Sequence, residues 1–414
     1  MLEKFKESLE FRCNFGYIAA QGLYWMIVCC TISMGNAYLS NKGFSTVSIG
    51  FLFAFAYLFA ALIQQIVSAI IDRSAKSNVM DVLFVLGIIL GVDLLIGLGT
   101  KESGFITGFS FLVGAMVATI MQPFLNSLNF HIEEYGVKMN FGVARASGSF
   151  FFFVMSIVAG NLMKFQSPNV APCFGFMTTA LFVATIVWIS IQLKNSRIQI
   201  APKYDPFEAT QAKNSFELSE IKSFITNNKM FFVFLIGVVC FFFGHLLINT
   251  FIYDITTTAG GDEADNGGLL AFAALVELPA MIFFSKLKER FKTRDMIIVS
   301  AIFFFVKILL TTLANTVGML YVSMFFQAFA FALFIPASVH YVDEIMDKTD
   351  AVKGQSAITV AITISNLISS LLGGMIIGAL NVNAALWFAT LITLVGVVIA
   401  IYGLLHKNKK IKNL

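Results

Sequence analysis

The stretch TVSIGFLFAFAYLFAALIQQIVSAIIDR, residues 46–73, decides the fold of this chain. Between Thr46 and Ile70 it carries no charged side chain. That length suffices to cross the hydrocarbon core of a bilayer, which takes about 20 residues of α-helix. The apolar run stops at Asp72 and Arg73, and charges at this place are typical of a helix that leaves the membrane. We therefore predict a transmembrane helix that ends in a charged turn.

The rest of the chain repeats this pattern. With 58% hydrophobic residues, 13% charged residues and a mean hydropathy of +0.82, it lies well outside the usual make-up of a water-soluble domain. Its apolar runs predict twelve transmembrane helices, at residues 14–37, 46–70, 79–99, 104–128, 142–163, 171–193, 230–254, 267–285, 296–315, 317–339, 356–379 and 382–405. The predicted fold is an all-α membrane protein.

Lysines and arginines predict the side of the membrane on which each loop lies, because short cytoplasmic loops retain positive charge. If both termini are cytoplasmic, 23 of the 28 Lys and Arg residues fall in cytoplasmic segments. Only Lys42, Lys101 and Lys164 fall in outer loops, and Arg145 and Lys307 lie within predicted spans. We expect a multi-pass protein of the inner (cytoplasmic) membrane with both termini in the cytoplasm. No cleavable signal peptide is expected, since the first apolar run is a full span without a cleavage site.

A long polar segment near the middle divides the chain into two halves of about six spans each. We predict an N-terminal six-helix bundle at residues 1–193, a cytoplasmic linker at 194–229 and a C-terminal six-helix bundle at 230–414. The five Cys and four His are scattered without metal or disulfide spacing. No nucleophile elbow, phosphate loop or sizeable soluble segment appears in the sequence. We therefore expect no enzyme, no metal and no cofactor.

The charged turn after the second predicted span returns after the eighth. The first reads Ser68-x-x-x-Asp72-Arg73 and the second Ser285-x-x-x-Glu289-Arg290. A weaker echo relates His131 and Glu134 after the fourth span to His340 and Glu344 after the tenth. Repeats at the same place in each half favour two pseudo-symmetric bundles, an arrangement that transporters use for alternating access.

This organisation resembles the major facilitator superfamily of transporters. Twelve spans as six plus six, a central cytoplasmic loop and a small-x-x-x-acid-Arg turn in each half carry the resemblance, which covers nearly the whole chain. It implies the major facilitator fold and a role in gating for Asp72, Arg73, Glu289 and Arg290, whose charges pair with loops or helix ends in one state and separate in another. A charged turn that only fixes topology is the alternative.

The fifth span carries a narrower resemblance. The run Asn140-Phe-Gly-Val-Ala-Arg145-Ala-Ser-Gly-Ser149 is similar to a Gly-x-x-Arg-x-x-Gly-Ser segment of the oligosaccharide:proton symporters, the branch that contains the lactose and sucrose permeases. Arg145 matches the later of two arginines there, while the sugar-binding one falls at Val143. The resemblance implies that Phe152 stacks on a sugar and that Asn126 or Asn129 replaces an acidic partner. Trp25 is a second candidate aromatic, although an ordinary packing role is open.

Two charges in the second half lie within apolar spans. Glu277 occupies the eighth span beside Pro279, and Lys307 occupies the ninth. Ionisable groups at membrane depth are costly and mark a transport pathway by default. By position they resemble the glutamate and arginine of the oligosaccharide symporters, which implies that Glu277 binds substrate or a proton and that Lys307 holds it ionised. A buried ion pair that only fixes packing is the alternative.

Proton coupling is less well defined. The histidine and glutamate that serve it in the lactose permease branch would fall near Gln327 and Ala330, so that relay is missing. Asp93 in the third span and His245 in the seventh are other candidates, and Asn249 lies one turn from His245. His245 titrates near neutral pH in an ordinary setting, whereas a histidine within a bundle also serves as a hydrogen-bond partner between helices.

Three functions stay open at this stage: a proton-coupled importer of an oligosaccharide or glycoside, which the intramembrane charges favour; a facilitator of drugs, nucleosides or another small molecule, which the many Phe residues would suit; and a membrane enzyme or sensor, for which no motif appears. The expected partners are a small-molecule substrate, protons and membrane lipid. We expect no nucleic acid, because the C-terminal lysines suit anionic lipid headgroups, and we expect a monomer.

Overall fold

The computed structural model describes residues 2–73, 78–100, 102–196 and 218–406, apart from a few side chains within the helices. Over these residues twelve helices are long and apolar enough to cross a membrane. All twelve agree with the predicted spans to within several residues, and Thr46–Ile70, Val79–Gly99 and Val382–Leu405 agree to the residue. The prediction of an all-α, multi-pass membrane protein is confirmed.

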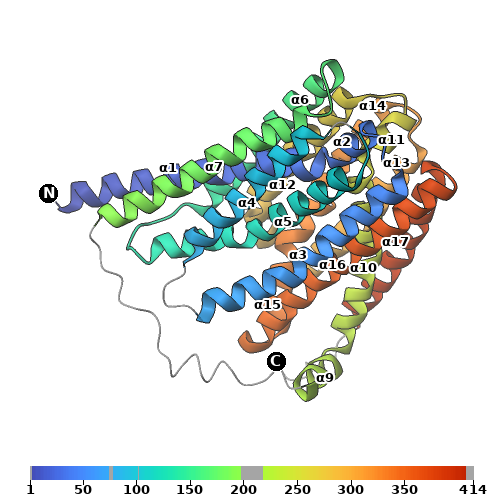
Figure 1. Cartoon of the computed structure of the whole chain (residues 1–414). Coiled ribbons are helices and arrows are strands. Elements are labelled where there is room, and N and C mark those ends of the chain that lie inside the picture. The colour runs from blue at the N-terminus through green and yellow to red at the C-terminus, as the bar shows by residue number, and fades with distance from the viewer. Residues whose placement is uncertain (1, 74–77, 101, 197–217, 407–414) are drawn as a thin grey trace. The chain divides into compact units, whose positions relative to one another are not determined.

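Figure 1 colours the helices from blue at the N-terminus to red at the C-terminus. The first half consists of α1 (Leu2–Val28), the π-helix η1 (Cys29–Ser33), α2 (Gly35–Asn41), α3 (Thr46–Arg73), α4 (Val79–Gly99), α5 (Phe105–Glu133), α6 (Phe141–Phe165) and α7 (Val170–Asn195). The second half consists of α9 (Leu218–Asn227), α10 (Lys229–Thr250), α11 (Ile252–Thr258), α12 (Glu263–Arg290), α13 (Thr293–Leu313), α14 (Val317–Phe325), the 3₁₀-helix η2 (Phe326–Ala328), α15 (Phe331–Ile345), α16 (Lys348–Ala379) and α17 (Val382–Leu405).

Several helices extend beyond the predicted span. The eleventh span was predicted to begin at residue 356, but α16 begins at Lys348, and the fourth was predicted to end at 128, but α5 continues to Glu133. Hydropathy detects the part of a helix that contacts lipid, whereas polar residues such as Lys and Gln are good helix formers outside that part. The helix ends are therefore hidden from a reading of hydropathy.

The chain packs into two compact units. Unit 1 comprises residues 1–45, 55–209 and 262–274, and unit 2 comprises 46–54, 210–261 and 275–414. The two units differ from the predicted bundles, residues 1–193 and 230–414, in the assignment of two helices. α3 begins in unit 2 and continues in unit 1 from Phe55, and α12 begins in unit 1 and continues in unit 2 from Leu275.

The internal duplication extends to single residues. The pair α2 (Gly35–Asn41) and α3 (Thr46–Arg73) recurs 217 residues later as α11 (Ile252–Thr258) and α12 (Glu263–Arg290). Gly43 and Gly260, also 217 residues apart, have φ angles of 87° and 84°. A side chain is strained in this left-handed region, so glycine ends both short helices in the same way. The two halves therefore share a local structure that their side chains only partly reveal.

Two close helix crossings repeat this symmetry. In unit 2, a Cβ atom on Gly50 would lie 2.3 Å from the carbonyl oxygen of Ser370, and in unit 1 a Cβ atom on Gly267 would lie 2.3 Å from that of Ser156. Any side chain at either glycine would push the two backbones apart. Small residues permit this approach in membrane bundles, and here they join α3 to α16 and α12 to α6.

Each unit has its own apolar core. In unit 1, α1 packs against α5, α6 and α7, and Leu9, Tyr17 and Phe182 are among its buried side chains. In unit 2, α10 lies along α17, as Figure 1 shows, and also packs against α16 and α13. Edge-to-face and tilted rings from three of its helices fill that core: Phe241, Phe242, Phe304 and Phe334.

Candidate functional site

A chain of polar side chains crosses the apolar core of unit 2. Lys307 on α13 donates from Nζ to Oε1 of Gln327 at 2.5 Å, and Gln327 donates from Nε2 to Oε1 of Glu277 at 2.8 Å. On its other side, Nζ of Lys307 lies 3.2 Å from Nδ1 of His245. The amide of Asn249 lies 3.2 Å from Nε2 of the same ring. Four helical segments thus contribute to one polar network.

The hydrogen-bond directions follow from the ammonium group. Because a charged lysine only donates, Nδ1 of His245 accepts, which places the imidazole proton on Nε2. That N–H requires an acceptor, and Asn249 supplies one when its amide oxygen is turned toward the ring. Lys307 is therefore the donor at the centre of the network, and both of its neighbours accept from it. The histidine in this arrangement is neutral.

Burial changes along the network. Lys307 is 0% exposed, His245 1% and Gln327 5%, whereas Glu277 is half-buried and Asn249 is exposed. A cation buried to this degree is stabilised by its two acceptors and by the nearby carboxylate. The two ends of the network are thus less enclosed than its centre. A change in the charge or position of the Glu277 carboxylate is therefore linked to the buried ammonium of Lys307 through the side-chain amide of Gln327.

A break in the tenth span positions Gln327. The helix is interrupted between α14 and α15 by η2, which contains Gln327. The carbonyl oxygen of Ala330 at this break accepts a hydrogen bond from the Ser300 hydroxyl at 2.7 Å. Broken helices are tolerated at membrane depth where neighbouring side chains satisfy the backbone. Pro279 lies within α12, two residues after Glu277, and removes another backbone donor near the network.

The predicted residues of unit 1 form a second cluster. The guanidinium carbon of Arg145 on α6 lies 4.3 Å from the ring centroid of Trp25 on α1, in the geometry of a cation–π contact. The ring of Phe152 meets Trp25 edge to face, with centroids 6.3 Å apart. All three side chains are half-buried. The arrangement offers a cation and aromatic surface together.

Gln21 extends this cluster, since it lies one turn before Trp25 on the same face of α1. Its Nε2 donates to the Tyr17 hydroxyl at 2.9 Å and to Oδ1 of Asn126 at 3.3 Å. Its Oε1 is buried, and no hydrogen-bond partner for that atom occurs among the described residues. Buried acceptors are normally satisfied. A ligand hydroxyl or amide would complete the bonding of Gln21.

Two further predicted residues of unit 1 lie elsewhere. Asn129 donates to Oε1 of Glu133, one turn further along α5, so Asn126 and Asn129 have different partners. Asp93 on α4 is 8% exposed and lines a small pocket of about 30 Å³ together with side chains of η1, α2 and α5.

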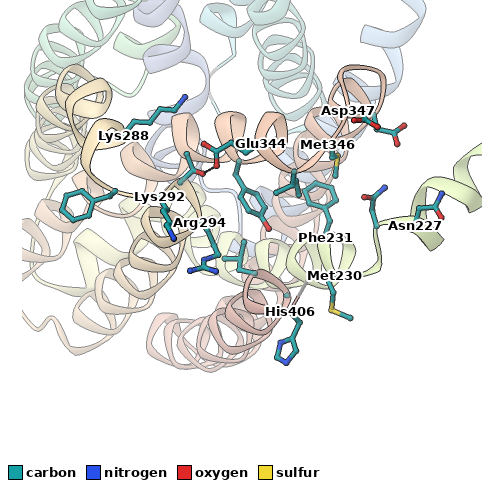
Figure 2. A pocket seen from close by; sticks show the side chains of 18 of the residues that line it. Asn227, Met230, Phe231, Lys288, Lys292, Arg294, Glu344, Met346, Asp347 and His406 are labelled. Carbon is teal, nitrogen blue, oxygen red and sulfur yellow. Dashed lines mark hydrogen bonds between the residues drawn. The ribbon is translucent and has the colours of Figure 1, made fainter. Parts of the chain in front are cut away.

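The charged turn of the second half borders a wide hollow in unit 2. This cavity of about 1000 Å³ is lined by Glu289 and Arg290 and by the ends of α10, α13, α15 and α17, and Figure 2 shows part of its lining. Both Glu289 and Arg290 are exposed. Thr293 donates a hydrogen bond to Glu344, and both residues line the cavity. The side chains of Asp72 and Arg73, their counterparts, lie outside the described residues.

The walls of this cavity carry both signs of charge. Lys288, Lys292 and Arg294 line the cavity together with Glu344 and Asp347, and Figure 2 labels all five. A single small ion of either sign would meet like charges there. Lys288 already contacts Nδ1 of His340 at 2.8 Å. We therefore interpret the hollow as the polar end of the bundle, not as the substrate site.

The structure brings together most of the predicted residues, but in two clusters. Glu277, Lys307, His245 and Gln327 meet in unit 2. In unit 1, Arg145 and Phe152 both contact Trp25, and Asn126 contacts Gln21 one turn away on α1. Sequence reasoning missed Gln21 and Tyr17. A glutamine within an apolar span, one turn from a tyrosine and from a tryptophan, was the available signal.

Comparison with known proteins places this geometry in a wider context. Residues 234–414, the second half of the chain, match the family model of the major facilitator superfamily. No curated protein sequence matches the chain.

Among solved structures, a variant of the nucleoside transporter NupG has a TM-score of 0.74 and 14% identity, and the match covers 95% of this chain and 99% of the other. The peptide transporter family member PepTSo has a TM-score of 0.69 and 11% identity, with 96% and 99% covered. A bacterial homologue of the human lysosomal transporter Spinster has a TM-score of 0.62 and 13% identity, with 97% and 96% covered. Identities this low speak for the fold alone. The chain has the major facilitator fold, twelve transmembrane helices in two pseudo-symmetric six-helix bundles.

Proposed function

We propose that this protein is a secondary active transporter that moves a polar solute across the cytoplasmic membrane by alternating access, in symport with protons. The preferred solute is an oligosaccharide or glycoside. The observation that carries the proposal is the network from Asn249 to Glu277, which sets a fully buried ammonium, a neutral imidazole and a half-buried carboxylate within one chain of hydrogen bonds.

The network supports proton coupling through a change of partners. When Glu277 is ionised, Gln327 donates to it and is held in register to accept from Lys307. A proton on Glu277 weakens the first of these bonds, because charge-assisted hydrogen bonds are about twice as strong as neutral ones. Gln327 is then free to turn, which changes its hydrogen bond with Lys307 and the contact between Lys307 and His245. Protonation of Glu277 thereby changes the hydrogen bonds of the buried Lys307 and His245.

The cluster in unit 1 supports a hydroxylated solute. Arg145, the free acceptor of Gln21 and Asn126 supply a donor and two acceptors, and Trp25 with Phe152 supplies aromatic surface. Sugars present hydroxyl groups at their edges and C–H groups on their faces, so they fit a site with both features. We assign Arg145, Asn126 and Trp25 to substrate binding and Glu277 to both substrate and proton.

The two helices shared between the units support alternating access. α3 begins in unit 2, where Gly50 touches α16, and α12 begins in unit 1, where Gly267 touches α6. Each crossing holds the first part of its helix within one unit, and the helix then continues into the other unit, so moving one unit against the other has to bend α3 and α12 beyond the crossings. In the proposed orientation, with both termini cytoplasmic, both crossings lie toward the outer face. The charged turns at Asp72, Arg73, Glu289 and Arg290 would gate the cytoplasmic end.

A nucleoside is the second candidate solute. One of the structural neighbours is described as a nucleoside transporter, and a nucleoside combines a ribose with a flat base that can stack on an aromatic ring. The contact of Arg145 with Trp25 occupies one face of that ring. We therefore rank the nucleoside after the oligosaccharide, which offers more hydroxyl groups to Arg145, Gln21 and Asn126 and depends less on one free aromatic face.

Uptake into sealed membrane vesicles tests the proposal. An inward proton gradient should drive accumulation of at least one radiolabelled disaccharide, trisaccharide or nucleoside, and an uncoupler should abolish it. Glu277→Gln should abolish accumulation while the folded yield is unchanged, because Gln keeps the shape of the side chain. Glu102→Gln, on an exposed loop residue, is the matched control. Gradient-independent uptake of every solute would refute proton symport, and normal accumulation by Glu277→Gln would assign Glu277 to packing.

A further inference from the structure

Asp93 lines a small pocket within unit 1. The pocket is bordered by η1, α2, α4, α5 and α7, and its polar lining consists of Asp93, Thr31, Tyr38 and Ser110 with the thiol of Cys30. Asp93 is 8% exposed, Thr31 5%, Tyr38 5% and Ser110 6%. A carboxylate shielded from water to this degree needs hydrogen-bond donors or a positive charge.

Two of the three neighbouring hydroxyl groups, those of Thr31 and Tyr38, donate away from the carboxylate, and the Ser110 hydroxyl lies within reach of both the carboxylate and the backbone carbonyl of Asp93. Thr31 donates to the carbonyl oxygen of Ile27 at 2.8 Å, Ser110 donates to that of Asp93 at 3.1 Å, and Tyr38 points to that of Gly97 at 3.4 Å. The hydroxyl oxygens of Thr31 and Tyr38 therefore keep lone pairs free for a ligand, and the Ser110 oxygen keeps one beside the carboxylate. The lining is a carboxylate surrounded by oxygen atoms with lone pairs, and such oxygen atoms are the ligands of a hard cation.

Space is available beside the carboxylate. The pocket volume of about 30 Å³ exceeds the 10–15 Å³ or so that one water molecule requires. A Cβ atom on Gly114 would lie 2.9 Å from Oδ2 of Asp93, so glycine keeps this volume open. The adjoining segment of the first span is a π-helix, Cys29–Ser33, and π-helical turns within α-helices occur frequently at functional sites.

The internal symmetry supplies an independent argument. α4 (Val79–Gly99) and α13 (Thr293–Leu313) each have 21 residues, and Asp93 and Lys307 are both the fifteenth. In unit 2 this position provides an ammonium group held between acceptors of the tenth and seventh spans, Gln327 and His245. In unit 1 the same position provides a carboxylate, and the fourth and first spans again provide acceptors, Ser110 and Thr31. One half thus carries a tethered cation where the other half has room for a free one.

We propose that the Asp93 pocket is a binding site for a small monovalent cation, of the size and charge of Na⁺. A single carboxylate neutralises one positive charge, whereas divalent cations are generally bound by more than one acidic group or keep several waters. Oxygen ligands without sulfur or imidazole suit a hard cation. The pocket holds about one water-sized group, which suits Na⁺ with little or no hydration. Asp93, Thr31 and Ser110 supply the ligating oxygens.

This site is separate from the network at Glu277 and can be tested without a transported solute. Purified protein in detergent is titrated with NaCl, with choline chloride keeping the ionic strength constant, while the melting temperature and the binding of radioactive sodium are measured. We expect one Na⁺ per chain and a melting temperature that rises with NaCl, since a ligand that binds only the folded state stabilises it. KCl should raise the melting temperature less.

Variants assign the effect to the pocket. Asp93→Asn keeps the shape of the side chain and should abolish both sodium binding and the shift in melting temperature. Thr31→Val, isosteric and without the hydroxyl oxygen, should weaken sodium binding by about tenfold with folding intact, the loss expected for one ligand. Glu102→Gln, an exposed acid, should bind sodium like the wild type. Sodium binding that persists in both Asp93→Asn and Thr31→Val would overturn the proposal.

A proton is the competing occupant, and pH distinguishes it. Besides Asp93, the titratable side chains that line the pocket are Cys30 from η1 and Tyr38 from α2, and α5 and α7 contribute none. The Lys42 ammonium lies 5.6 Å from the Tyr38 ring and donates to the carbonyl of Thr100. If Na⁺ binds, lowering the pH should weaken its apparent affinity in the wild type. A melting temperature that responds to pH through Asp93 but not to NaCl at any pH would refute the sodium site.

Discussion

Replacing Lys307 by methionine separates a role in coupling from a role in packing. Lys307 is fully buried, and its ammonium group is held by Gln327 at 2.5 Å and His245 at 3.2 Å. Methionine has a similar length and no charge, so Lys307→Met removes the cation with little change of volume. Two acceptors, Oε1 of Gln327 and Nδ1 of His245, lose their donor.

The expected change in stability is small because two large contributions oppose each other. Hydrogen bonds to a charged group stabilise by roughly 1.5–3 kcal/mol each, so two of them give about 3–6 kcal/mol. Burying the ammonium costs several kcal/mol, and the variant avoids that cost. The difference should leave the melting temperature within about 5 °C of the wild type, since about 1 kcal/mol corresponds to a few degrees in a protein of this size or smaller.

The expected change in transport is large. A gradient of about one pH unit is worth about 1.36 kcal/mol per proton, which supports up to about tenfold accumulation of a solute that moves with one proton. Lys307→Met should lose this accumulation and leave at most equilibration. The assay compares internal and external solute in proteoliposomes at steady state. Lys288→Met is the matched control, because Lys288 also contacts a histidine nitrogen, His340 at 2.8 Å, yet is exposed.

A Lys307→Met protein that accumulates solute like the wild type would refute the reasoning, and the network would then serve packing alone. Lys307→Arg provides a second test, since it keeps the charge and five donors. If a positive charge at this place is what matters, Lys307→Arg should retain part of the accumulation. Loss in both variants with normal melting temperatures would show that the geometry of the ammonium group, not its charge alone, is required.

Three further predictions address other parts of the structure. Trp25→Leu should weaken substrate binding by about tenfold, because a partly desolvated cation–π contact with Arg145 contributes about 1–2 kcal/mol and orders the site. Calorimetric titration measures the affinity, with Trp387→Leu, at an exposed position, as the control. Equal affinities in both variants would contradict a role of Trp25 in substrate binding. Gly267→Ala should slow transport by about tenfold or more. Its Cβ atom would lie 2.3 Å from the Ser156 carbonyl oxygen, and such overpacking typically costs about 1–3 kcal/mol. The added methyl group of Gly104→Ala enters open space and should leave the rate unchanged; equal rates in both variants would show that the crossing plays no part in transport. Asp262 contacts Lys164 at 2.7 Å, and the hydrogen bond from Lys164 lowers the pKa of the Asp262 carboxyl below its ordinary value of 3.8. A carboxyl group whose pKa is lowered in the folded state stabilises the fold above its unfolded pKa, and this contribution is lost as the pH falls through the folded pKa. Asp262→Asn should therefore melt slightly below the wild type at pH 7, and the difference should shrink only as the pH falls below the ordinary value of 3.8; a difference that grows in acid would contradict this.

Much of the fold could be predicted from the sequence because hydropathy is a direct physical signal. A helix that faces lipid has to be apolar along its whole length, so the runs at Thr46–Ile70 and Val382–Leu405 gave their own boundaries. The same reasoning singled out Glu277, Lys307 and His245, since an ionisable group within such a run is costly and needs a partner. The amide bridge through Gln327 was hidden, because it depends on the helix break at Phe326–Ala328, and a hydropathy average smooths over a break of that length.

The features that sequence reasoning missed are those that depend on precise helix positions. Asp93 and Lys307 occupy equivalent places in the two halves, but their side chains have opposite charge, so a search for matching residues passes over them. The glycine pairs are similar, since Gly50 and Gly267 gain their meaning only from the backbone opposite each of them. Gln21 could have been found as a polar residue in an apolar span, although only the structure shows that one of its buried atoms lacks a partner.

The most direct test of proton-coupled transport is the movement of protons caused by the solute itself. Proteoliposomes without any imposed gradient are placed in weakly buffered medium with a pH indicator, and single oligosaccharides, glycosides and nucleosides are added outside. The account predicts that one of them raises the external pH as protons enter with it, that Glu277→Gln shows no such change, and that an uncoupler removes it. Entry of a solute without any change of pH in the wild type would contradict the account.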